Sequence, residues 1–356
     1  MQTVVIGTRG SRLALAQTRQ IVEALARYHP TLDLRIETIV THGDQNPDDP
    51  LQHMHRKGVF TSELEAALLA GRIDLAVHSA KDLPAPLPAE LAIICTPPRE
   101  DPREALIQGS GFRTQDSGLR VPATGELRQG SGVSGQDVGP VFDCDPPDVP
   151  GSRSATAPTT LLAEGALVGT CSLRRQAQLA RLRPDLRFGP IRGNIETRIA
   201  KVRRGEFDGT VLALAGLRRA GLEHEAAAVF NIDVIVPAPG QGILAIEARA
   251  ADAWLAELIA PLDHAPTRLA LECERRVVSG LGATCFTPIG VLAEIDGDAL
   301  SVRARVLTLG GRATAEAALR GHSGNHATLV DRVIRTIDAQ RKQWTEPGGP
   351  DAPHVG

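Results

Sequence analysis

The feature that most constrains the fold of this chain of 356 residues is a repeated alternation of strand-like and helix-like segments. Apolar runs at 3–6, 34–40 and 73–77 are separated by segments with helical periodicity. The alternation resumes with runs at 166–170 and 210–215. Strands that alternate with helices build a largely parallel sheet with helices on its faces. The sequence therefore predicts an α/β fold in two blocks.

Capping residues indicate where several helices begin. Ser11 and Asn194 each precede a helical pattern and can accept a hydrogen bond from its first turn. Ser62 and Glu65 have the spacing of a capping box. Ser172 opens a further helix in the second block. We therefore expect a helix to start at each of these places.

Residues 109–160 interrupt the alternation. Gly, Pro, Ser, Asp and Thr dominate there without a helical or strand period, which predicts a disordered insertion. Gly130, Gly132 and Gly135 spell G-x-G-x-x-G within it. A dinucleotide-binding fingerprint needs a strand before it and a helix after it, so we reject that interpretation. The Pro- and Gly-rich end, 347–356, is expected to be a flexible tail.

The length predicts two or three domains, and the order of the segments favours three. Domain 1 is expected to comprise 1–103 and about 237–260, because the turn-rich PAPGQG leads into an alternating run that can cross back. Domain 2 comprises 104–236 and contains the insertion. Domain 3, residues 261–346, has a helix near 267–278 followed by strand-like segments, which predicts a small α+β domain.

Composition excludes several classes of protein. The formal net charge is −3 and aromatic residues are 3% of the chain, which argues against a nucleic-acid-binding protein. The five cysteines have no CxxC spacing, as is typical of free thiols in a reducing cytoplasm. The chain begins without a signal-peptide pattern, and no apolar run approaches bilayer length. We expect a cytoplasmic protein without metal, nucleic-acid or membrane partners.

Arginines recur where predicted strands end and helices begin. Open α/β sheets bind ligands at these junctions, where helix N-termini attract anions. Guanidinium groups add bidentate recognition of carboxylate or phosphate. A single arginine could simply lie on a solvated helix face, but the set predicts a polyanionic ligand. Its members are Arg9, Arg174, Arg175, Arg192, Arg198, Arg218 and Arg219.

Residues 78–84, His-Ser-Ala-Lys-Asp-Leu-Pro, place polar side chains at the end of the strand predicted at 73–77. Asp82 could be an ordinary turn or cap residue, as is common before Leu-Pro. It could instead be a carboxylate in a cationic cleft beside Lys81, able to stabilise a developing positive charge and to shuttle protons. His78 is interpreted as a structural histidine rather than a metal ligand.

Cys285 lies in GLGATCFTPIG, among small residues and before Pro288. Most single cysteines are inert core residues, and this interpretation suits Cys95, Cys171 and Cys273. A thiol in a glycine-rich turn is accessible and could act as a thiolate nucleophile. The residues alone leave both possibilities open for Cys285.

Seven motifs together identify a family. They are TRGSRLALAQ, KGVFTSELEAALLAGRIDLAVHSAKDLP, VGTCSLRRQAQL, IRGNIETR, LALAGLRRAGL, PAPGQG and CFTPIG, in this order. The chain resembles the hydroxymethylbilane synthase (porphobilinogen deaminase) family of porphyrin and haem biosynthesis over nearly its whole length, apart from 109–160 and the tail. The resemblance implies two α/β lobes like those of periplasmic binding proteins, a small third domain and a monomer.

The resemblance also implies an activity and its residues. A transferase of this family condenses four porphobilinogen molecules, with release of ammonia, onto a covalent dipyrromethane primer, and then releases 1-hydroxymethylbilane by hydrolysis. Asp82 matches the catalytic carboxylate, Cys285 the cysteine that carries dipyrromethane through a thioether, and Lys57, Gly58 and Phe60 a mobile loop. Positions that match cofactor- or substrate-binding residues are Arg9, Ser11, Ser79, Lys81, Thr170, Ser172, Arg174, Arg175, Arg192, Arg198 and Arg219.

The chain departs from the family pattern at two places besides the insertion. Ala283 and Thr284 precede the matched cysteine where the family often has Gly-Gly, and Cys171 stands where serine is commoner. The alternative to an enzyme is a non-catalytic small-anion-binding protein on the same two lobes. Such a protein would have no use for Asp82 within the cations or for an accessible Cys285.

Overall fold

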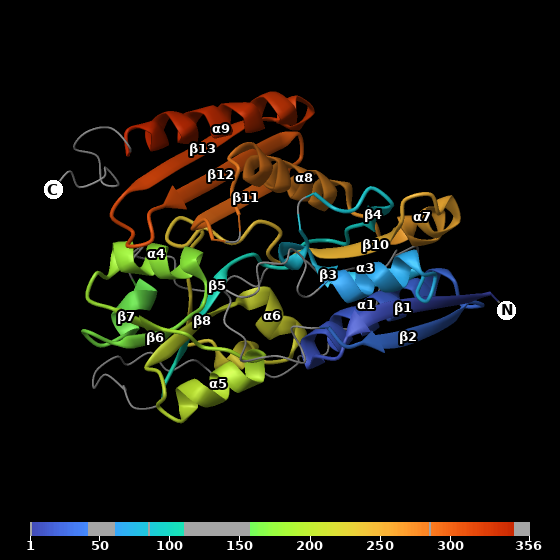
Figure 1. The fold of residues 1–356 in the computed structure, drawn as a ribbon, viewed down its shortest axis with the longest axis horizontal. Helices are drawn as coiled ribbons and strands as arrows, with labels where there is room; N and C mark the ends of the chain where they lie inside the picture. The colour runs from blue at the N-terminus through green and yellow to red at the C-terminus, as the bar shows by residue number, and fades with distance from the viewer. Residues whose placement is uncertain (1, 42–60, 85, 110–156, 285, 345–356) are drawn as a thin grey trace, which may run out of the picture.

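The computed structural model describes residues 2–41, 61–84, 86–109, 157–284 and 286–344. Two five-stranded sheets and one three-stranded sheet organise these residues. Figure 1 shows the two five-stranded sheets side by side, with the three-stranded sheet and its helices lying across both. The mixed α/β class predicted from the sequence is confirmed.

The first five-stranded sheet contains the N-terminal strands. β1 runs parallel to both of its neighbours, whereas β10 runs antiparallel to β3 and β4. The strand order is β2 (Asp33–Ile39), β1 (Thr3–Arg9), β3 (Leu75–Ser79), β10 (Leu244–Arg249) and β4 (Leu91–Cys95). Its helices are α1 (Arg12–Tyr28), α3 (Ser62–Leu69) and α7 (Ala253–Ile259).

The second five-stranded sheet repeats this plan. β6 runs parallel to both of its neighbours, and the inserted strand β5 runs antiparallel to β8. The strand order is β7 (Arg187–Gly189), β6 (Leu167–Gly169), β8 (Gly209–Ala213), β5 (Glu104–Gln108) and β9 (Ala228–Val229). Its helices are α4 (Leu173–Leu182), α5 (Ile195–Arg203) and α6 (Leu214–Arg219).

Two connections join these sheets. After β4 the chain leaves the first sheet and enters the second as β5, and after β9 it returns to the first as β10. The strand by which the chain enters each sheet from the other one, β5 or β10, is antiparallel to its neighbours. The residue boundaries of the three predicted domains stay a prediction.

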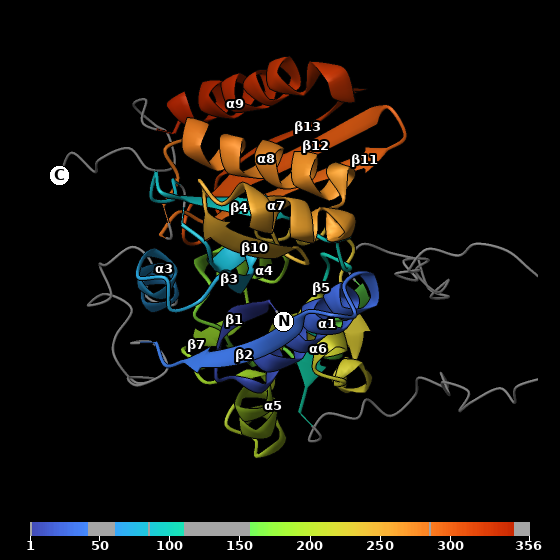
Figure 2. The same ribbon diagram turned by 90° about the vertical axis from the view of Figure 1, so that its right-hand side faces the viewer.

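The third unit is an antiparallel sheet covered by two helices. Its strands are β11 (Ile289–Asp296), β12 (Ala299–Leu307) and β13 (Thr314–His322), and its helices are α8 (Ala265–Gly280) and α9 (His326–Lys342). Fully buried Val277, Val291 and Val333 join both helices to the sheet in one core. Figure 2 shows α9 at the outside of the molecule and α8 between it and the first sheet.

Short 3-10 helices occupy several turns. They span Ala80–Asp82, Ala157–Leu161, Glu223–Glu225, Ala260–Leu262 and Ser323–Asn325. The sequence predicts disorder over 109–160, but residues 157–160 belong to the 3-10 helix Ala157–Leu161, so the prediction is wrong for these residues. The remainder of that insertion, 110–156, and the predicted tail lie outside the described residues.

The predicted helix starts are mostly confirmed. Ser11 caps α1 by accepting from the Ala14 amide, and Asn194 caps α5. The capping box at Ser62 is wrong: α3 begins at Ser62 itself, and its side chain donates to Glu63 instead of receiving a backbone amide. The strand predicted at 73–77 is shifted by two residues: β3 runs from Leu75 to Ser79, so His78 and Ser79 belong to the strand.

Candidate active site

A small cavity opens at the carboxyl edge of the first sheet. β1 ends at Arg9 and the neighbouring parallel strand β3 ends at Ser79, so both lead to the same edge. The cavity has a volume of about 60 Å³, well below the about 300–1,000 Å³ of a typical small-molecule site, so it can hold only part of a ligand. Its polar lining residues are Arg9, Ser11, Gln17, Thr61, His78, Ser79 and Asp82.

The cavity brings together four residues that the sequence predicted for the site. Ser11 Oγ accepts from the Ala14 amide at 3.2 Å and so holds the N-terminus of α1 at the cavity. Ser79 Oγ accepts from Gln17 Nε2 at 3.1 Å. Helix N-termini favour anions because their first amides lack backbone partners. This edge of the first sheet is therefore suited to a carboxylate.

Lys81 and Asp82 lie in the 3-10 helix that follows β3, and both are exposed. Protein groups nevertheless crowd the Lys81 ammonium, and this desolvation lowers its pKa, while Asp82 opposes the shift. The glycine-rich return connection packs closely here: a Cβ on Gly240, whose φ is +74°, would lie 2.9 Å from the Lys81 amide nitrogen. A larger residue at 240 would displace the helix that carries Asp82.

The second sheet offers the same arrangement at the end of β6. Thr170 Oγ1 accepts from the Ser172 amide at 3.0 Å. Ser172 Oγ then accepts from the Arg175 amide at 3.4 Å and caps α4. Thr170 and Ser172 thus occupy the place in the second sheet that Arg9 and Ser11 occupy in the first. Each sheet presents a serine-capped helix N-terminus at the end of its central parallel strand.

Glu104 is a residue of this region that the sequence reasoning missed. It is fully buried on β5 and accepts from both Arg174 and Arg175, with 2.8 Å between Arg175 Nη2 and Glu104 Oε2. Arg174 also donates to the Val236 carbonyl at 2.9 Å. Burial alone would raise the pKa of Glu104, but the two guanidinium groups more than reverse this effect and hold the pKa well below its usual range. Glu104 therefore holds both guanidinium groups in place.

Cationic side chains of the second sheet interact electrostatically with Asp82 and its neighbour Lys81. Burial lowers the pKa of Arg198, Arg175 lowers it further, and Asp82 opposes the shift. Arg175 likewise acts on the pKa of Lys81. We call these four residues the inter-sheet cluster: Lys81 and Asp82 from the first sheet, Arg175 and Arg198 from the second. It brings together charges that are about a hundred residues apart in the sequence.

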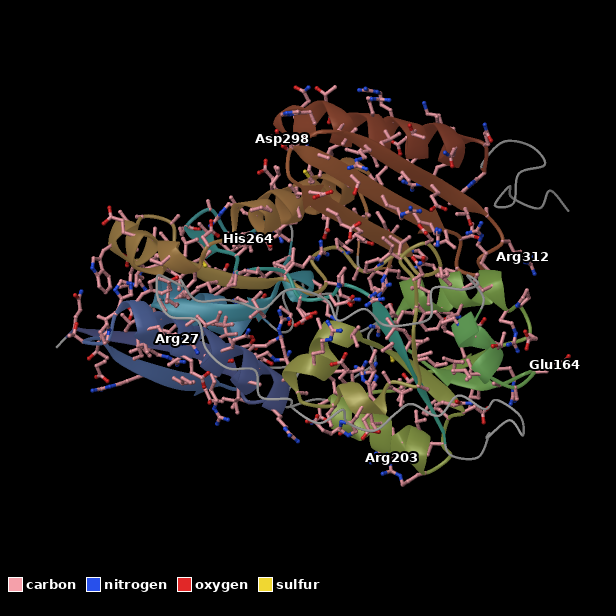
Figure 3. The ribbon with its side chains drawn as sticks, turned by 180° about the vertical axis from the view of Figure 1, so that it is seen from behind. Arg27, Glu164, Arg203, His264, Asp298 and Arg312 are labelled. Carbon is pink, nitrogen blue, oxygen red and sulfur yellow. The ribbon has the colours of Figure 1, made fainter. Side chains whose placement is uncertain are left out.

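The other predicted arginines have varied surroundings. Arg219 donates to the Gly242 carbonyl at 2.8 Å, and burial lowers its pKa to about 10. Arg218 is held by Glu100 at 2.8 Å and by Glu223 at 2.9 Å, which is a structural arrangement. Arg192 is half-buried. By contrast, Arg27, Arg203 and Arg312, which are labelled in Figure 3, have exposed side chains and do not line this cavity.

Four residues singled out from the sequence, Cys285, Lys57, Gly58 and Phe60, lie outside the described residues. Among the other cysteines, burial raises the pKa of the Cys95 and Cys273 thiols, that of Cys273 to about 11, so neither suits a nucleophile. Cys171 is half-buried and its Sγ donates to the Ile191 carbonyl at 3.3 Å.

A second cavity among the described residues is larger and lies elsewhere. It has a volume of about 1470 Å³, is lined by residues of the third unit from Phe286 to Trp344, and contains none of the predicted site residues. Within the described part of the chain, no three His, Cys, Asp or Glu side chains form a group that could hold a metal ion. No helix there has the length and apolar character to cross a bilayer.

Comparisons with known proteins identify the family of this chain. The sequence matches the family described as "Porphobilinogen deaminase, dipyromethane cofactor binding domain" over residues 4–134 and 145–257. A porphobilinogen deaminase from Roseiflexus sp. (strain RS-1) is 40% identical over 311 residues, which are 87% of this chain and 88% of that protein. One from Nitrobacter hamburgensis is 39% identical over 334 residues, 93% of this chain and 92% of that protein.

Among solved structures, a periplasmic binding protein from Salmonella typhimurium matches with a TM-score of 0.37 and 10% identity, covering 74% of this chain and 92% of that chain. A likeness this weak adds nothing to the assignment, which rests on the sequence matches. The chain therefore belongs to the porphobilinogen deaminase family, whose matched domain binds a dipyrromethane cofactor.

Proposed function

We propose that this protein is a hydroxymethylbilane synthase that joins four porphobilinogen molecules with release of ammonia and then releases 1-hydroxymethylbilane by hydrolysis. The observation that carries the proposal is the position of one carboxylate, Asp82, which lines the cavity with Arg9 and Ser11 and interacts electrostatically with Lys81 and Arg198 of the inter-sheet cluster. A site built only to bind an anion gains nothing from a carboxylate in that position. The monomeric state and the cytoplasmic location remain predictions.

The residues present fit a dipyrromethane cofactor. Each of its pyrroles carries an acetate and a propionate, so the group needs cations and free amides. The inter-sheet cluster supplies the cations, and the N-termini at Ser11 and Ser172 supply amides beside serine hydroxyls. When bound, the cofactor supplies the acceptor end to which the substrate pyrroles are added. Cys285 is the proposed attachment residue because its motif, CFTPIG, resembles that of the family.

The chain's own residues would divide the work of each condensation. Arg175 and Arg198 hold substrate carboxylates, and Glu104 fixes the orientation of Arg175 through two hydrogen bonds. Loss of ammonia from the aminomethyl group leaves a cationic pyrrole, which the Asp82 carboxylate stabilises through the pyrrole N–H. The pyrrole α-carbon that forms the new C–C bond to this cation then loses its proton, and Asp82 accepts it.

The proposal is tested by Asp82→Asn, which keeps the shape of the side chain and removes its charge and basicity. We expect kcat to fall by about 10²- to 10⁴-fold, the range that a positioned acid or base contributes. The fold and the binding of carboxylates should persist, because the cations are untouched. The matched control is Asp298→Asn, in the exposed turn between β11 and β12, which should leave kcat unchanged.

A near-normal kcat in Asp82→Asn would remove that residue from its role. If the wild-type protein binds porphobilinogen carboxylates but never releases ammonia, the alternative of a non-catalytic anion-binding protein would replace the proposal.

A further inference from the structure

A buried acid–imidazole pair lies directly behind the cavity. His78 Nε2 and Glu247 Oε2 are 3.1 Å apart, and the two side chains are 3% and 0% exposed. The strands pair antiparallel, with Ala245 opposite His78 and Glu247 opposite Ala76, so both side chains project from the same face of the sheet. The pair is therefore fixed by the register of β3 and β10.

The buried carboxylate of Glu247 is expected to destabilise the fold. Neither of its carboxylate oxygens has a well-aligned hydrogen-bond donor among the described residues, although His78 is in contact. An ionised carboxylate removed from water destabilises a fold by several kcal/mol unless it is well paired. A buried group that the fold satisfies this poorly needs an explanation in function or in strain.

The surrounding charges do not provide that explanation. Glu65 on α3 faces the pair; burial raises its pKa and the Glu247 charge raises it further. Arg275 on α8 interacts electrostatically with Glu247, but the Arg275 guanidinium donates its hydrogen bond to the Pro84 carbonyl, at 2.6 Å. Towards the cavity lie Arg9 and Asp82. His78 is thus the group that connects the buried carboxylate to the cavity.

The ring of His78 has one nitrogen available. Nε2 faces Glu247, whereas Nδ1 makes no hydrogen bond with any described residue. A carboxylate next to one ring nitrogen favours the tautomer with the proton on that nitrogen, which leaves the other as a proton acceptor. Glu247 therefore orients the imidazole with Nδ1 as the acceptor.

Among the polar lining residues of the cavity, His78 is the one besides Asp82 whose side chain can act as a general acid or base. The guanidinium of Arg9 offers only hydrogen-bond donors, and the other lining residues offer only hydroxyl and amide groups. A substrate seated on the exposed side of Asp82 would separate that carboxylate from solvent. The cavity side would then be the route by which Asp82 is returned to its ionised form.

We propose that His78 is a proton-relay residue for Asp82 and that Glu247 is the residue that positions it. The inference rests on the proposed function. In each condensation the pyrrole α-carbon that has formed the new C–C bond gives its proton to the Asp82 carboxylate, which passes it within the cavity to Nδ1 of His78. The imidazolium, stabilised by Glu247, then gives this proton to the ammonia released in the same condensation, which leaves as ammonium. Asp82, His78 and Glu247 end each cycle as they began it.

The decisive variant is His78→Gln, whose amide can still donate to Glu247 but cannot relay a proton. We expect unchanged thermal stability and unchanged covalent loading by intact mass, with kcat at least about tenfold lower and KM within about twofold. His78→Ala should lose the same activity and regain part of it with added imidazole. Glu247→Gln should lower kcat similarly, and the double variant should be no worse than either single one, because the two residues act as one unit.

A second measurement does not depend on turnover. The ¹⁵N spectrum of the His78 ring should show a protonated Nε2 and a bare Nδ1, and Glu247→Gln should disturb this tautomer. The matched control is Glu316→Gln, the same change in an ion pair of the third unit, which should leave kcat and the His78 spectrum unchanged.

Three results would overturn the inference in an enzyme whose wild type is active: His78→Gln with at least half of the normal kcat, no rescue of His78→Ala by imidazole, or a protonated Nδ1 with a bare Nε2. An inactive wild type would instead refute the proposed function itself, so the two failures are distinguishable.

Discussion

Glu104 shows what a single buried carboxylate does for this site. It pairs with Arg174 and Arg175 while fully buried. Removing one partner of such a pair leaves uncompensated charge and costs about 3–5 kcal/mol. Glu104→Gln should therefore lower the free energy of unfolding by that amount in chemical denaturation. Glu164→Gln, an exposed carboxylate, is the control and should change stability by less than about 0.5 kcal/mol.

The same residue predicts a pH dependence of stability. The ordinary pKa of a glutamate is 4.5, and the folded protein holds the pKa of Glu104 far below that value. A depressed pKa means that the folded state binds the proton less tightly than the unfolded state, so its contribution is complete above pH 4.5 and is lost as the pH falls further. Glu104→Gln should make the free energy of unfolding depend less on pH below 4.5. The same pH dependence as in the wild type would contradict the account.

At the scale of elements, the serine-capped helices couple stability to binding. Ser172→Ala removes the cap of α4 and should cost about 1 kcal/mol of stability. It also removes a hydroxyl from the proposed carboxylate site, so KM for porphobilinogen should rise several-fold. Asp252→Ala removes the cap of α7, outside the proposed site, and should cost similar stability without affecting KM. Equal KM values in both variants would mean that the Ser172 hydroxyl at the start of α4 does not contribute to substrate binding.

Local sequence signals predicted those elements whose pattern is self-contained. The β1–Ser11–α1 and β6–Ser172–α4 units follow from an apolar run, a cap and a helical period. β5 was not predicted, because it is a short segment that carries a fully buried glutamate, and its partners are far away in the sequence. At α3 the local capping signal was also insufficient: the buried Thr61 rather than Ser62 precedes the helix, and its side chain makes no capping hydrogen bond.

The site was predictable to the same extent. Arg9, Ser11, Ser79 and Asp82 line one cavity, as expected for residues at strand ends. Glu104 and Glu247 were not predicted, since a glutamate within an apolar strand gives no sign of the partner it will meet. The partners come from another strand for Glu247 and from helix α4 for Glu104, so sheet register and helix packing determine them.

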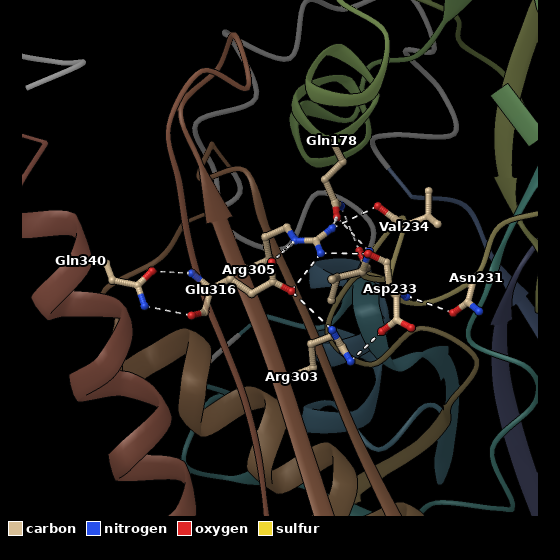
Figure 4. Close-up of polar contacts among 9 residues, drawn as sticks. Gln178, Asn231, Asp233, Val234, Arg303, Arg305, Glu316 and Gln340 are labelled. Atoms are coloured by element: carbon tan, nitrogen blue, oxygen red, sulfur yellow. Dashed lines mark hydrogen bonds and ion pairs between the residues drawn. The ribbon is translucent and has the colours of Figure 1, made fainter. Parts of the chain in front are cut away.

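At the scale of the whole molecule, a polar network fastens the third unit to the second sheet. Figure 4 shows Arg305 between Gln178 of α4, Glu316 of β13 and the chain at Asp233–Val234. Arg305 is 4% exposed and donates to the carbonyls of Asp233 at 2.9 Å and Val234 at 3.0 Å. This buried guanidinium holds the β12–β13 sheet against α4.

Arg305→Leu should therefore loosen the third unit while leaving the inter-sheet cluster intact. Hydrogen exchange followed by mass spectrometry should show faster exchange in β12 and β13, with a loss of about 3–5 kcal/mol in stability. Arg320→Leu, on the exposed part of β13, is the control. Unchanged exchange in Arg305→Leu would mean that apolar packing alone fastens the unit.

The central claim is that this member of the porphobilinogen deaminase family carries a covalent dipyrromethane and uses it in tetrapyrrole synthesis. The most direct test is the intact mass of the denatured protein, with peptide mapping around residue 285, after production in cells with ample porphobilinogen. The account predicts an adduct of two condensed pyrrole units on the peptide that contains Cys285. An unmodified chain, or an adduct on another residue, would contradict it.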